Sequence, residues 1–116
     1  MLVTKRLNRR YQIGTGEVTL RIVVGEGQFG NSLVEIDDVE VASGAVAMVR
    51  LGAGGDLVGK VARVVTTVTD VQRSTNRTSM RYVLSGGPEE ETFEETADVE
   101  TDGGSVQYVV RFRFEA

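Results

Sequence analysis

Apolar and polar residues alternate along most of this chain, which is the pattern of β-strands that bury one face. The clearest run is 105–115. Its alternate positions are apolar: Val106, Tyr108, Val110, Phe112 and Phe114. Successive side chains of a strand point to opposite faces, so this run predicts one buried face and one solvent-facing side, with only Val109 interrupting the polar set.

A second alternating run, 91–101, precedes the first across Asp102-Gly103, and we predict that the two runs form a tight hairpin. In that register three apolar pairs face each other: Val99 and Val106, Ala97 and Tyr108, Phe93 and Phe112. The same register places Glu94 opposite Arg111 on the outer face. A shift of one residue would destroy both matches, so the hairpin is the firmest prediction from the sequence.

The first half of the chain predicts short strands separated by turns. Tyr11 and Ile13 are expected to anchor a first strand, and alternation over 17–24 predicts a second. Two more short strands, 33–36 and 39–41, flank Asp37-Asp38, and the two-residue spacing predicts another tight hairpin.

The middle of the chain continues the strand pattern. The nearly all-apolar run 45–51 predicts a strand that is buried on both faces. A glycine-rich connection follows over 52–60. The β-branched run 61–71 predicts a strand with a bulge at Val64-Val65, because such residues lose side-chain freedom in helices and pack well on sheets. A further alternating strand is expected around 80–84.

Eight or nine short strands with regular turn signals and no helix predict an all-β fold, an antiparallel β-sandwich. The length of 116 residues fits one domain spanning residues 1–116. In architecture the pattern resembles an immunoglobulin-like or fibronectin-like sandwich without the cysteines and tryptophan of antibody domains. Residues 1–8 are expected to form either a mobile N-terminal arm or a short edge strand.

The chain contains neither cysteine nor histidine. Their absence removes disulfides, thiolate nucleophiles, histidine-dependent catalysis and cysteine- or histidine-based metal sites. We therefore expect no enzyme activity, no catalytic residue, no cofactor and no metal centre of these kinds. A carboxylate-based hydrolase stays open, because two acids far apart in sequence can meet in space.

The formal net charge of −4 argues against nucleic acid as a partner, because phosphates require a basic surface. No segment reads as a secretory signal or as a membrane span. From these observations we expect an acidic, cytoplasmic protein that binds neither nucleic acid nor membrane.

Two glycine motifs imitate nucleotide-binding loops. Residues 25–30 fit G-x-G-x-x-G and look like the glycine-rich loop of protein kinases, but Ser32 stands where kinases have valine and no histidine exists for an H-R-D motif. Residues 54–60 fit G-x-x-x-x-G-K, but Val61 stands where a P-loop has Ser or Thr to hold magnesium. We interpret both motifs as turns.

Charged and loop residues supply the candidate partner contacts. Basic residues crowd the N-terminus and the 72–77 loop, and acids crowd 89–102. Phe29 is the aromatic expected at an exposed loop tip, where it would anchor an interface. The seven candidate contacts are Gln28, Phe29, Arg6, Arg9, Arg10, Arg73 and Arg77.

The sequence therefore predicts a non-catalytic β-sandwich interaction module. It would be a subunit of a larger assembly or a protein-binding adaptor, acting through a protein partner or through self-association as a homo-oligomer. The alternative is a small-ligand or carbohydrate-binding β-sandwich, assisted by calcium at loop aspartates. The aspartates considered for calcium are Asp37, Asp38, Asp56, Asp70 and Asp102.

Overall fold

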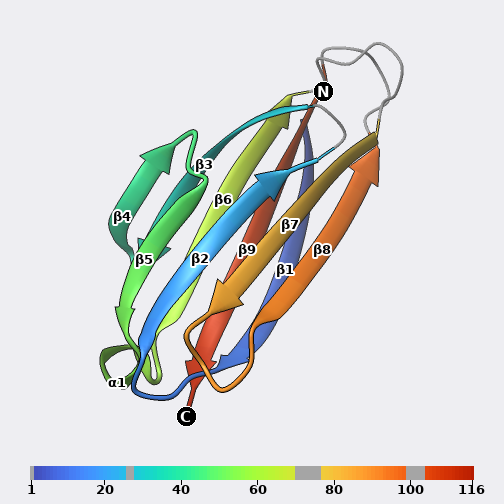
Figure 1. Cartoon of the computed structure of the whole chain (residues 1–116). Coiled ribbons are helices and arrows are strands. Elements are labelled where there is room, and N and C mark those ends of the chain that lie inside the picture. Colours follow the sequence, from blue (N-terminus) through green and yellow to red (C-terminus); the bar gives the residue numbers. More distant parts are fainter. Residues whose placement is uncertain (1, 26–27, 70–76, 99–103) are drawn as a thin grey trace.

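Two β-sheets packed face to face make up the computed structural model, which describes residues 2–25, 28–69, 77–98 and 104–116 (Figure 1). These residues form nine strands and one short helix, and the predicted all-β sandwich is confirmed. In chain order the elements are β1 (Leu2–Gln12), β2 (Glu17–Val24), β3 (Phe29–Ile36), β4 (Val39–Gly44), β5 (Met48–Ala53), α1 (Gly54–Leu57), β6 (Val61–Thr69), β7 (Arg77–Ser85), β8 (Glu91–Asp98) and β9 (Ser105–Glu115).

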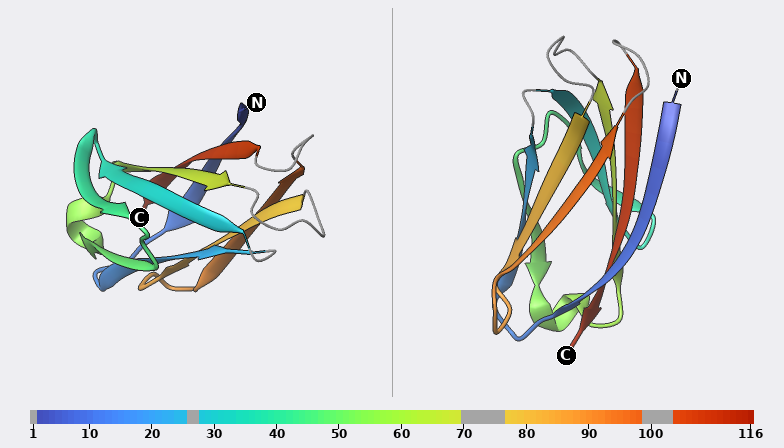
Figure 2. Two further views of the ribbon diagram at one scale, coloured as in Figure 1. Left: turned by 90° about the horizontal axis from the view of Figure 1, so that it is seen from above. Right: turned by 90° about the vertical axis from the view of Figure 1, so that its right-hand side faces the viewer.

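One sheet has five strands in the order β1-β9-β6-β3-β4, and the other has four in the order β5-β2-β7-β8. Figure 2 shows the two layers from above and from the side. Neighbouring strands are antiparallel throughout, except that β1 runs parallel to β9. The parallel pair joins the start of the chain to its end, and residues 2–8 belong to this edge strand.

The predicted hairpin between β8 and β9 is wrong. β8 pairs with β7 in the four-stranded sheet, whereas β9 lies between β1 and β6 in the other sheet. Glu94 is therefore opposite Arg81 rather than Arg111. Alternation identifies the buried face of each strand, but it does not identify the neighbouring strand, because several strands here offer an equally apolar face. Val99 and Asp102-Gly103 lie outside the described residues.

The predictions for β2 and for the β3–β4 hairpin are confirmed. β2 has the predicted bounds, and β3 turns into β4 at Asp37 and Asp38. Both aspartates have positive φ angles, 47° and 69°, as a two-residue hairpin turn requires. The turn is also held from outside, because Asp37 Oδ1 accepts a hydrogen bond of 3.0 Å from the amide of Val61.

Two predictions for the middle of the chain need correction. The strand expected over 45–51 begins only at Met48, whose side chain is 60% exposed, so it is not buried on both faces. The reason is its position, since β5 belongs to one of two packed sheets, and the outer face of each sheet meets solvent. β6 pairs with both neighbours without a register shift, so the bulge predicted at Val64-Val65 is absent from this strand.

The core lies between the two sheets and contains most of the aromatic residues. Its largest fully buried side chains include Tyr11, Tyr82, Tyr108, Phe112 and Phe114. One polar link crosses the core. The Thr78 hydroxyl donates to the Ala97 carbonyl oxygen at 2.7 Å, so the Tyr108 hydroxyl, also 2.7 Å away, donates to Thr78. This link joins β7 and β9, which belong to opposite sheets.

Candidate functional site

The outer face of the five-stranded sheet carries arginines from three neighbouring strands. Alternate residues of β9 from Val106 to Phe114 fill the core, so Arg111 and Arg113 project outward and are exposed. The strands on either side, β1 and β6, contribute more arginines at matching positions. We call this surface the arginine face; it consists of Arg6, Arg10, Arg63, Arg111 and Arg113.

The strand register places like charges directly opposite each other on the arginine face. Arg10 is the partner of Arg113 across the parallel β1–β9 pair, and Arg63 is the partner of Arg111 across the antiparallel β6–β9 pair. Like charges at opposed positions destabilise a sheet. An anion bound here would relieve that repulsion, which makes this face the strongest candidate site among the described residues.

Two carboxylates neutralise the arginine face only in part. Glu35 accepts a hydrogen bond of 2.8 Å from Arg63, and Glu115 lies 3.6 Å from Arg10. Among the described residues, no carboxylate forms an ion pair with Arg6, Arg111 or Arg113. Surplus positive charge is therefore available on a chain whose net charge is −4.

A surface hollow of about 660 Å³ lies at the β1–β9 end of the arginine face. It is lined by Asn8, Arg9, Arg10, Val61, Arg111 and Arg113. A second hollow of about 230 Å³ shares Asn8 and Arg111 with the first. Guanidinium groups stay charged and bind carboxylate or phosphate through two parallel hydrogen bonds, so the surface is chemically suited to acidic groups.

Arg9, a predicted contact residue, is engaged within the chain. Its Nη2 donates to Glu95 Oε1 at 2.8 Å, and Lys5 Nζ lies 3.3 Å from the other oxygen of the same carboxylate. Lys5 also donates to the Thr96 carbonyl oxygen at 2.6 Å. These contacts run from β1 to β8 and close one side of the sandwich, so Arg9 has a structural role here.

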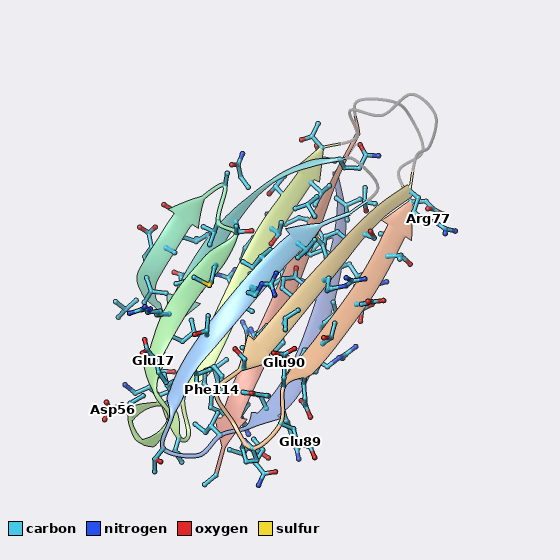
Figure 3. The ribbon with its side chains drawn as sticks, in the orientation of Figure 1. Glu17, Asp56, Arg77, Glu89, Glu90 and Phe114 are labelled. Carbon is cyan, nitrogen blue, oxygen red and sulfur yellow. The ribbon has the colours of Figure 1, made fainter. Side chains whose placement is uncertain are left out.

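Gln28 and Arg77 lie together, far from the arginine face. Gln28 is only 8% exposed, and its Nε2 donates to the Arg77 carbonyl oxygen at 3.2 Å. Arg77 Nε lies 3.8 Å from Asp98 Oδ1. Figure 3 places Arg77 at the opposite end of the sandwich from Phe114, the chain neighbour of Arg113.

The seven predicted contacts therefore do not form one surface. Arg6 and Arg10 lie on the arginine face, whereas Gln28 and Arg77 lie at the other end of the sandwich. Phe29 is the first residue of β3, where it pairs with Thr69; its side chain and the whole of Arg73 lie outside what the structure describes.

Arg63, Arg111 and Arg113 are not among the contact residues predicted from the sequence. Alternation with Phe112 and Phe114 does show that Arg111 and Arg113 face outward. The missing information was which strands flank β9, because a parallel partner from the far end of the chain leaves no local signal.

The described part of the chain gives no support for calcium binding by the loop aspartates. No group of three or more acidic residues there is arranged to hold a metal ion, and Asp70 and Asp102 lie outside that part. Within the same residues, no helix is long and apolar enough to cross a membrane.

The fold and its surface define a β-sandwich with a basic outer face on an acidic chain. Comparisons with protein-family models, with curated proteins and with solved structures find no match.

Proposed function

We propose that this chain is a non-catalytic β-sandwich interaction module, a subunit of an assembly or an adaptor, whose arginine face binds an acidic protein surface. The observation that carries the proposal is the pair of opposed arginine couples, Arg10 with Arg113 and Arg63 with Arg111, beside a hollow of about 660 Å³. Repulsion between the opposed arginines lowers folding stability. A partner's carboxylate would relieve that repulsion on binding, which strengthens the complex.

A protein partner fits this surface better than nucleic acid does. Proteins that bind single strands stack bases on aromatic side chains, but Tyr108, Phe112 and Phe114 of β9 all point into the core. The chain as a whole would also repel a polyphosphate, since its net charge is −4. A few arginines around a small hollow are suited to a cluster of carboxylates.

A labelled peptide in which glutamate alternates with serine tests the proposal. Its binding to the chain is followed by fluorescence anisotropy at about 0.15 M ionic strength, where weak long-range attraction is screened. The double variant Arg111→Gln/Arg113→Gln should bind at least about tenfold more weakly, because each hydrogen bond between charged groups contributes about 1.5–3 kcal/mol.

The matched control is Arg21→Gln/Arg50→Gln, which removes the same charge from the other sheet. Arg21 and Arg50 are exposed residues of β2 and β5, so this variant should bind the peptide like the wild type. Equal loss in both double variants, or tighter binding of a single-stranded oligonucleotide than of the peptide, would overturn the proposal.

The immunoglobulin-like connectivity and the cytoplasmic location stay predictions.

A further inference from the structure

An acidic turn lies at the same end of the sandwich as the hollow on the arginine face. We call residues 89–91 the acidic turn; Glu89 and Glu90 end the connection from β7 to β8, and Glu91 is the first residue of β8 (Figure 3). Glu89 and Glu90 are exposed, and no cation of the described residues forms an ion pair with Glu89, Glu90 or Glu91. The acidic turn therefore offers up to three carboxylates to another molecule.

Tyr11 holds the acidic turn in place. The Tyr11 hydroxyl donates to the Glu89 carbonyl oxygen at 2.8 Å and accepts from the Gly87 amide at 3.1 Å. The Tyr11 ring itself is buried, at 1% exposure. A turn fixed in this way loses little conformational entropy when it binds, which favours its use as a docking element.

The acidic turn cannot reach the arginine face of its own chain. Tyr11 points into the sandwich toward Glu89, whereas its neighbour Arg10 points out of the opposite side of β1. The thickness of β1 and its sheet therefore separates the two charged surfaces. The acidic turn and the arginine face therefore cannot pair with each other within one chain.

We propose that the acidic protein surface recognised by the arginine face is the acidic turn of a second copy of this chain. The inference rests on the function proposed above. Because the two surfaces lie at one end of the molecule but on opposite sides of β1, the acidic turn of one copy enters the hollow of the next in a head-to-tail contact. Such a contact leaves one charged surface of each kind at the ends of the assembly, unless the copies close into a ring.

Light scattering on a sizing column gives the first test. At low salt the mass should reach at least twice the 12.6 kDa of one chain, and it should fall to the monomer value at about 1 M salt, where exposed charges are screened. A wild-type chain that stays monomeric at low salt and high concentration overturns the inference.

A charge swap gives the sharper test. Arg111→Glu/Arg113→Glu makes both charged surfaces acidic, and Glu89→Lys/Glu90→Lys makes both basic, so each variant alone should be monomeric. An equimolar mixture should recover the association, because every contact between the two variants then joins opposite charges. Arg21→Glu/Arg50→Glu is the control; it changes charge on the other sheet and should associate like the wild type.

The outcomes separate this inference from the proposed function. All four substituted positions of the swap are exposed or at a turn, and circular dichroism verifies that each variant is folded. If the mixture stays monomeric while the glutamate peptide still needs Arg111 and Arg113, self-association is wrong and the arginine face binds a foreign acidic protein. If every variant alone still associates, the interface lies elsewhere and the inference is overturned.

Discussion

The ring centroids of Phe93 and Phe112 lie 5.3 Å apart, although the two residues belong to strands of opposite sheets. Phe112 is fully buried and also meets Tyr82 edge-on, with centroids 5.9 Å apart. We expect Phe112→Ala to lower the free energy of unfolding by about 3–5 kcal/mol and Phe93→Ala, which is only partly buried, by less. Urea titration of the single and double variants should give a coupling of about 0.5–1.5 kcal/mol. Strict additivity would contradict the contact.

Engineered cysteine pairs distinguish the observed strand pairing from the predicted hairpin. The chain has no cysteine of its own, so each pair is the only one present. Arg81→Cys/Glu94→Cys places the thiols at directly opposed positions of β7 and β8 and should form a disulfide under mild oxidation. Glu94→Cys/Arg111→Cys joins opposite sheets and should stay reduced. Free thiols are counted by alkylation and mass spectrometry, and a disulfide in the second pair would show that the topology is wrong.

The hydroxyl groups of Tyr82 and Tyr108 differ in hydrogen bonding although both rings are buried. Tyr108 bonds to Thr78 at 2.7 Å, whereas the Tyr82 hydroxyl has no hydrogen-bond partner among the described residues, and the hydroxyl of its neighbour Thr66 bonds to Ser32 at 2.8 Å. Tyr108→Phe should therefore lower the unfolding free energy by about 1 kcal/mol or more, while Tyr82→Phe should change it by less than about 0.5 kcal/mol or raise it. Urea midpoints measure both, and a larger loss in Tyr82→Phe contradicts the structure.

Alkaline pH should unfold this protein through its buried tyrosines. Burial raises the pKa of Tyr11, Tyr82 and Tyr108 above the ordinary value of 10.0. The unfolded chain then releases protons at lower pH than the folded chain, so stability is complete below about pH 10 and is lost as pH rises through the folded pKa values. Urea midpoints should fall steeply above about pH 10. Tyr82→Phe should make that fall shallower, and an unchanged slope would contradict this assignment.

Glu95 should stabilise the fold through the two cations on β1. Its side chain is 17% exposed and meets both Arg9 and Lys5. Glu95→Gln leaves two neighbouring cations without a carboxylate, so we expect a loss of about 1–2 kcal/mol in unfolding free energy. Glu94→Gln is the matched control, because the exposed Glu94–Arg81 pair should contribute less than about 1 kcal/mol. Chemical denaturation of the two variants should separate them, and equal losses would argue against a special role for Glu95.

Arg9→Gln tests the same contacts from the other side and bears on function. Because Arg9 is engaged with Glu95, its removal should lower stability and, although Arg9 also lines the hollow, should weaken peptide binding far less than Arg111→Gln/Arg113→Gln does. Loss of binding with unchanged stability would return Arg9 to the partner contacts predicted from the sequence.

The sequence by itself determined the fold class and the direction in which most side chains point. Successive side chains of a strand point to opposite faces, so Phe112 and Phe114 were identified as buried and Arg111 and Arg113 as outward-facing without any tertiary information. The turn at Asp37 and Asp38 was equally local, since its two-residue length selects the hairpin geometry.

Only the tertiary structure decided which strands are neighbours. β9 has an apolar face that fits β8 as well as β6, and its parallel partner β1 comes from the opposite end of the chain. Pairing between distant segments depends on how the whole core fills, not on any one segment, so the pattern along the chain does not encode it. For that reason Phe93 and Phe112 meet across the core instead of along a hairpin, and the arginines of three strands gather on one face.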